Sequence, residues 1–139
     1  MSSLAERYAH VPARTVRFWA LIDSSVSWPL ALPVMAPHFI AMLYWLNGLL
    51  GGASEPPVFE AMHLLFVCLT GCLVSVWVVA RLLHPIGLMA LIDGWGRTAV
   101  ALVLVWLLLG YAAPPVLWLF VFTEGIGALA QLRAASRPS

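Results

Sequence analysis

The sequence predicts an all-α integral membrane protein, a four-helix bundle preceded by a short interfacial helix. Two observations lead to this fold class. Hydrophobic residues make up 63% of the 139 residues and charged residues only 9%, a balance that soluble domains of this length do not show. The apolar residues also gather in four stretches, each close to the ~20 residues that cross a ~30 Å hydrocarbon layer. These predicted spans are residues 28–50, 58–83, 95–112 and 116–132, and they leave a single transmembrane domain over residues 1–139.

The basic residues give the predicted orientation. All seven are arginines, and they precede the first span, flank the connection between the second and third, or follow the fourth. They are Arg7, Arg14, Arg17, Arg81, Arg97, Arg133 and Arg137. The other two connections contain no basic residue. By the positive-inside rule, the chain is predicted to be a multi-pass protein of the inner (plasma) membrane with both termini in the cytoplasm.

The first span is the least regular. Pro29, Pro33 and Pro37 recur every four residues, so they share one face of a helix while each removes a backbone donor. A membrane helix tolerates proline where neighbouring helices satisfy the freed carbonyls. We therefore expect residues 28–50 to cross as one bent helix with its proline face turned inward.

Residues 15–22, upstream of this span, form a short amphipathic segment that is expected to lie along the cytoplasmic surface. A continuous helix over residues 14–48 would be about 52 Å long, too long for the layer. A break near residues 23–25 is therefore expected.

Two short motifs occur twice, in the same order. They are Ala-Leu-Ile-Asp at residues 20–23 and 90–93, and Pro-Pro-Val at residues 56–58 and 114–116. The first motif precedes the first and third spans, and the second opens the second and fourth spans. A glutamate follows each copy of the second motif, Glu60 and Glu124. This order predicts a tandem repeat of one helical hairpin, with both copies in the same orientation.

Two tandem hairpins in a chain of this length resemble the DoxX-like group of small four-helix membrane proteins. In that group an arginine opens the first span and a glutamate lies early in the second, and Arg17 and Glu60 take those places here. The family's Gly-x-x-Lys pattern is absent, because residues 44–48 read Tyr-Trp-Leu-Asn-Gly. The resemblance implies an accessory or redox-linked inner-membrane protein that works beside quinones or thiol oxidoreductases.

Ionisable residues inside the spans are candidates for function, because charge in a bilayer is costly. Glu124 lies near the middle of the fourth span, where a carboxyl is expected to be protonated unless a cation reaches it. Glu60 and His63 are three residues apart and share one helical face. These three residues are the predicted catalytic groups. The alternative for Glu124 is a structural hydrogen bond between helices.

No metal ion is predicted, and the identity of any cofactor stays open. Glu60-x-x-His63 has the spacing of di-iron bundles, but those need two copies and two further glutamates. A mononuclear site of His38, Glu60, His63 and Glu124 conflicts with depth, because His63 lies about 9 Å and His38 about 15–18 Å below the outer edge. His38 is instead assigned to ligand binding.

Asp93 and Arg97 are four residues apart at the entrance of the third span, and they too are predicted to bind a ligand. A simpler interpretation is that Asp93 caps the helix and forms an intrahelical ion pair with Arg97. Asp23 occupies the matching place before the first span and has the same interpretation.

Small residues on one face of the second span predict close helix packing. Cys68, Gly71, Cys72 and Ser75 share this face. No helix end or cation lies near enough to activate the thiols, which argues against a redox pair.

Two functions are compatible with these residues. The first is an accessory, redox-linked component that binds a quinone or another lipophilic molecule in a polar bundle interior. The alternative is a membrane-embedded acid/base enzyme, an isomerase or cyclase acting on a prenyl or sterol-like substrate. The expected partners are the lipid bilayer, a quinone or isoprenoid-like ligand, and a membrane protein or a second copy of the chain. A net charge of +1 gives no indication of nucleic-acid binding.

Overall fold

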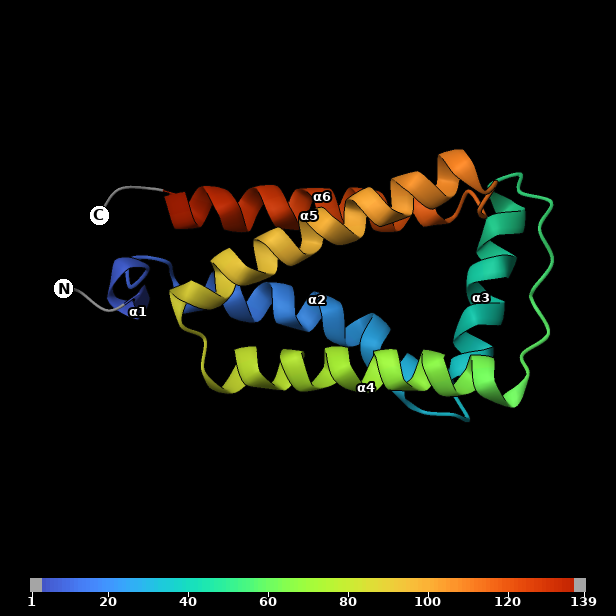
Figure 1. The fold of residues 1–139 in the computed structure, drawn as a ribbon, viewed down its shortest axis with the longest axis horizontal. Helices are drawn as coiled ribbons and strands as arrows, with labels where there is room; N and C mark the ends of the chain where they lie inside the picture. Colours follow the sequence, from blue (N-terminus) through green and yellow to red (C-terminus); the bar gives the residue numbers. More distant parts are fainter. Residues whose placement is uncertain (1–3, 137–139) are drawn as a thin grey trace.

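The computed structural model describes residues 4–136, and this part of the chain is entirely helical apart from turns and connections. The helices are α1 (Leu4–Arg7), α2 (Ala13–Ala31), α3 (Ala36–Leu49), α4 (Ala61–Leu83), α5 (Gly87–Gly110) and α6 (Leu117–Ser136). In Figure 1, α2, α4, α5 and α6 extend along the long axis of the molecule, and α3 lies across one end. The predicted all-α class is confirmed for these residues.

Two helices, α4 and α5, are long and apolar enough to cross a membrane, and the bent pair of α2 and α3 is a third candidate if it counts as one broken span. The distribution of apolar and polar side chains is also that expected of a membrane protein. Large apolar residues cover the outside, with Leu73 71% and Leu109 76% exposed, whereas Arg81 and Gln131 are completely buried. Polar groups inside and apolar groups outside are typical of a helical protein whose solvent is lipid.

The predicted bounds of the first span are wrong. Two helices, α2 and α3, replace it and are bent by 118° relative to each other. Leu32 has extended backbone angles, as the residue before a proline prefers, so Pro33 ends α2. Pro37 lies in the first turn of α3, where its missing N–H costs nothing. Pro33 and Pro37 therefore separate two helices, whereas Pro29 lies inside α2.

The predicted surface helix and the break after it are also wrong. Residues 15–22 form the first half of α2, and Val16 and Trp19 are buried there. Ser24 and Ser25 donate hydrogen bonds to the carbonyl oxygens of the residues three positions earlier, so their hydroxyl groups are satisfied within a continuous helix. The break that shortens the segment lies after residue 31.

The remaining helices differ from the predicted spans by a few residues at one or both ends, and most at the start of α5. α5 begins at Gly87 instead of residue 95, so the short apolar run at 86–92 belongs to the same helix. α4 begins at Ala61 and α6 at Leu117, each just after a Pro-Pro-Val motif. α6 is not among the helices apolar enough to span a membrane, since it also contains Glu124, Gln131 and Arg133.

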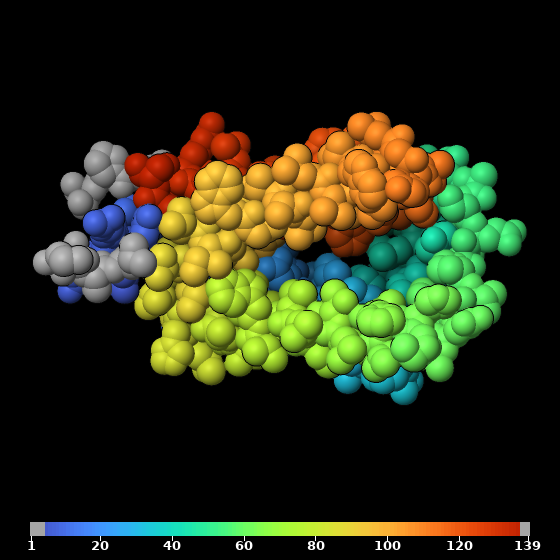
Figure 2. Space-filling model, in the orientation of Figure 1, coloured from blue at the N-terminus to red at the C-terminus, as the bar shows by residue number. Residues whose placement is uncertain are grey.

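The helices form two close pairs, α2 with α4 and α5 with α6. The first pair approaches at Gly71, where a Cβ atom would lie 2.3 Å from the backbone nitrogen of Ala31. α2 also contacts α5 and α6 and so joins the two pairs. Figure 2 shows the molecule hollowed between α4 and α5, with α2 and α3 visible behind them.

The arginines between residues 4 and 136 gather toward one end of the molecule. The starts of α2 and α5 and the ends of α4 and α6 lie at the same end of the molecule as α1 (Figure 1). The six arginines between residues 4 and 136 all lie in α1 or in the halves of the longer helices nearest this end. Arg137 lies outside the described residues.

Candidate functional site

Five charged side chains from four helices meet inside the molecule. Their exposed fractions are 0% for Arg81, 4% for Arg97, 7% for Asp93, 16% for Asp23 and 19% for Glu124. We call this group the charge cluster. Asp23 lies on α2, Arg81 on α4, Asp93 and Arg97 on α5, and Glu124 on α6. The two arginines are enclosed, and only the carboxyl groups of α2 and α6 keep appreciable exposure.

Arg81, on α4, contacts both aspartates of the cluster. Its Nη2 donates a hydrogen bond to Asp23 Oδ2 over 2.5 Å, and its Nη1 lies 2.7 Å from Asp93 Oδ2. Because Arg81 is only two residues from the end of α4, it reaches the cluster from the last turn of this helix.

Arg97 contacts all three carboxyl groups. Its Nε donates to Asp93 Oδ2 over 2.9 Å, and its Nη1 donates to Glu124 Oε2 over 3.1 Å. Its Nη2 donates both to Asp23 Oδ1 and, over 3.3 Å, to the carbonyl oxygen of Trp19. A cation therefore does reach Glu124, from a neighbouring helix.

Aromatic rings and a glycine hold the two guanidinium groups in place. Arg81 lies over the ring of Trp77 at 5.5 Å, and Arg97 over the ring of Trp19 at 5.0 Å. Gly127 provides room on α6, because a Cβ atom there would lie 2.9 Å from Arg97 Cδ.

Asp93 is the most highly coordinated member. Besides both arginines, it accepts hydrogen bonds from Trp77 Nε1 over 2.9 Å and from Gln131 Nε2 over 2.7 Å. The predicted ion pair between Asp93 and Arg97 is present, but the predicted capping role is wrong because α5 starts six residues before Asp93. Asp23 likewise lies inside α2, not at its start.

The two aspartates of the Ala-Leu-Ile-Asp motifs play equivalent parts. Asp23 and Asp93 each pair with both Arg81 and Arg97. Buried charges are tolerated only when they are paired and hydrogen-bonded, and removal of one partner leaves an uncompensated charge. The cluster therefore connects the two helix pairs, because each of its charges needs partners on another helix.

The other predicted site residues do not join the cluster. Glu60 and His63 lie at the start of α4, both exposed, and Arg81 is about 30 Å further along this helix by its rise. His38 is exposed in the first turn of α3. The structure thus brings Asp93, Arg97 and Glu124 together and leaves Glu60, His63 and His38 elsewhere. Between residues 4 and 136, no group of three or more His, Cys, Asp or Glu side chains is arranged to hold a metal ion.

Several members of the site were not among the predicted site residues, although their spacing was visible in the sequence. Polar and aromatic residues recur at one or two helical turns on each contributing helix. The pairs are Trp19 and Asp23, Trp77 and Arg81, Asp93 and Arg97, and Glu124 and Gln131. Arg81 was interpreted only as a loop-flanking charge, because the topology rule explains it equally well without a buried partner.

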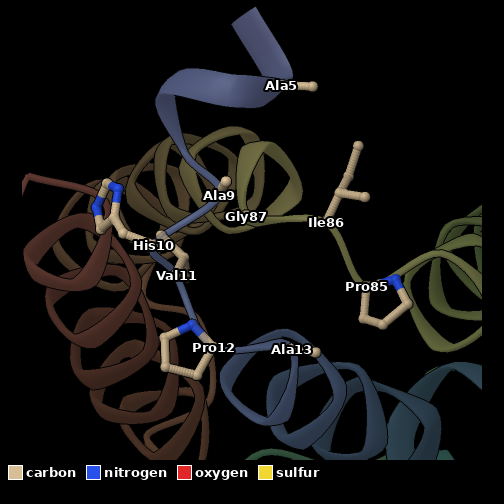
Figure 3. Close-up of a pocket in the computed structure, with 9 residues that line it drawn as sticks. All are labelled: Ala5, Ala9, His10, Val11, Pro12, Ala13, Pro85, Ile86 and Gly87. Atoms are coloured by element: carbon tan, nitrogen blue, oxygen red, sulfur yellow. The ribbon is translucent and has the colours of Figure 1, made fainter. Parts of the chain in front are cut away.

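Two cavities lie outside the cluster. One, an open pocket of about 370 Å³, lies between the N-terminal segment and the α4–α5 connection, and Figure 3 shows His10 at its edge with the ring turned away from Ile86 and Pro85. His10 Nε2 lies 3.1 Å from the carbonyl oxygen of Ala134. The second cavity is an apolar groove of about 330 Å³ between α5 and α6. Neither cavity is lined by a member of the charge cluster.

No protein-family model, curated protein or solved structure matches this chain.

Proposed function

We propose that this chain is a multi-pass inner-membrane protein of the DoxX-like kind, a four-helix bundle with both termini in the cytoplasm. In this proposal α2 with α4 and α5 with α6 form the two repeated hairpins. Its support is that both Ala-Leu-Ile-Asp motifs deliver an aspartate to the same two arginines. The orientation is supported by the arginines, which all lie in the helix halves nearest one end of the molecule within residues 4–136.

Its function is that of an accessory, redox-linked component that binds a quinone or another lipophilic molecule in the polar interior. The observation that carries this proposal is the buried charge cluster with two partly exposed carboxyl groups, Asp23 and Glu124. An apolar ligand body suits the hollow beside the apolar helices α4 and α5 (Figure 2). A carboxylate accepts hydrogen bonds, which suits the hydroxyl groups of a reduced quinone.

A membrane-embedded acid/base enzyme acting on a prenyl or sterol-like substrate is the second candidate. Glu124 favours it, as a partly exposed carboxyl group that a single arginine holds in place. Such catalysis needs a second proton-transferring group facing the same space. Glu60 and His63 do not supply it, because they lie at the far end of α4. The ligand-binding proposal therefore has the better support.

Mass spectrometry of molecules that copurify in mild detergent tests the proposal. We expect a quinone with the wild-type protein and at least tenfold less with Glu124→Gln, because an amide cannot take up or release a proton beside the ligand. Glu60→Gln is the matched control and should retain the ligand. An isoprenoid or sterol-like molecule would instead support the enzyme, and phospholipid alone would contradict both proposals.

Topology is tested separately with reporter fusions. A reporter placed after Ala53, in the connection between α3 and α4, is expected to lie outside the cytoplasm, and one after Ser139 inside it. The reason is that the arginine-bearing helix halves share one end of the fold. An external C-terminus would rule out four spans with both ends inside.

A further inference from the structure

The charge cluster contains an odd number of ionisable groups. Its two guanidinium groups face three carboxyl groups, so full ionisation would leave one uncompensated negative charge. The charges that act on Glu124 are those of Arg97 and Asp93 on α5 and of Asp23 on α2, and Arg81 on α4 pairs with both aspartates.

Within the described residues, no cation other than Arg81 and Arg97 forms an ion pair with a carboxyl group of the cluster. Arg133 is exposed on α6, nine residues beyond Glu124, which is about 13 Å along the helix. An unpaired charge in a dry interior costs several kcal/mol, and proteins commonly avoid this by neutralising one group. Uptake of one further positive charge by the cluster would remove this excess.

The contacts identify which carboxyl group receives it. Asp23 and Asp93 each pair with both arginines, and Asp93 accepts two further hydrogen bonds. Glu124 contacts Arg97 alone, and its 3.1 Å contact is the longest of the five ion pairs. Protonation of Glu124 therefore weakens one ion pair, whereas protonation of either aspartate would weaken two.

We propose that Glu124 is an exchangeable proton-binding site, with the proton on Oε1 while Oε2 accepts the hydrogen bond from Arg97. The proton enters and leaves through the partly exposed edge of this side chain, and release leaves a carboxylate facing Arg97. A proton fits better than a sodium ion, because no group of three or more His, Cys, Asp or Glu side chains between residues 4 and 136 is arranged around a metal position. This inference does not depend on the ligand proposed above, so copurification results leave it untouched.

One structural consequence is that Glu124→Gln reproduces the protonated state. The amide oxygen still accepts from Arg97, and the side chain keeps its shape and neutral charge. The variant is therefore expected to fold with the helix content and detergent elution volume of the wild type, which makes it a clean test.

Infrared spectroscopy of the purified protein in vesicles, titrated with pH in H₂O and in D₂O, measures the bound proton directly. We expect one protonated-carboxyl C=O band per chain near neutral pH, shifted in D₂O and lost at high pH. The band should be absent from Glu124→Gln and present in Glu60→Gln, whose exposed carboxyl lies at the other end of α4.

Three outcomes would overturn the proposal. They are a wild-type spectrum without this band near neutral pH, a band that persists in Glu124→Gln, and a band that sodium chloride but not choline chloride removes at constant pH. The last outcome would assign the site to sodium instead of a proton. Loss of the band from both variants would also contradict it, because Glu60 is remote from the cluster.

Discussion

Replacing Arg97 with glutamine is expected to lower the free energy of unfolding in detergent by about 3–5 kcal/mol, the cost of removing one partner from a buried ion pair. Arg97 is 4% exposed and contacts Asp23, Asp93 and Glu124. Without it, Arg81 still pairs with Asp23 and Asp93, and Glu124 loses its partner. Chemical denaturation followed by circular dichroism measures the loss.

Two further variants make this result specific. Arg133→Gln removes an exposed arginine from α6 and should change stability by less than about 0.5 kcal/mol. Adding Asp23→Asn to Arg97→Gln should recover part of the loss, because Arg81 then pairs with Asp93 without a competing aspartate. If Arg97→Gln were as stable as Arg133→Gln, the cluster would not contribute to folding.

Gly71→Ala is expected to destabilise the protein by about 1–3 kcal/mol, the usual cost of overpacking. The added Cβ would lie 2.3 Å from the backbone nitrogen of Ala31 and 2.5 Å from the carbonyl carbon of Leu30. Backbone atoms cannot move aside as the end of a flexible side chain can, so α2 and α4 would have to separate. The same denaturation experiment measures this effect.

Gly96→Ala is the matched control for this prediction. Gly96 lies inside α5, and no neighbouring atom is within 4 Å of the position of its Cβ. Alanine is a better helix former than glycine, so this variant should gain roughly 0.5–1 kcal/mol. A gain in both variants would show that α2 and α4 do not pack closely at Gly71.

Local rules made much of the helical architecture predictable from the sequence. The long apolar runs predicted α4 and most of α5, because length and hydropathy suffice to identify a helix in lipid. The two Pro-Pro-Val motifs marked the approach to α4 and α6, because Pro57 lies four residues before Ala61 and Pro115 two residues before Leu117. The prolines within residues 29–37 predicted an irregular helix, but they did not predict the angle between the helices before and after them. The extended backbone of Leu32 before Pro33 ends α2, and the structure sets the angle between α2 and α3 at 118°.

The candidate site divides in the same way. The sequence by itself determined that Asp93 and Arg97 would pair, because a four-residue spacing places them on one helical face, and it determined that Glu124 would lie within a helix. Only the tertiary structure decided that Asp23, Arg81 and Glu124 join that pair, and that Glu60 and His63 do not. These contacts connect residues up to 74 positions apart, and such a contact depends on how the helices rotate and pack. Helical periodicity fixes which residues share a face of one helix, but the packing of all the helices together fixes which faces meet.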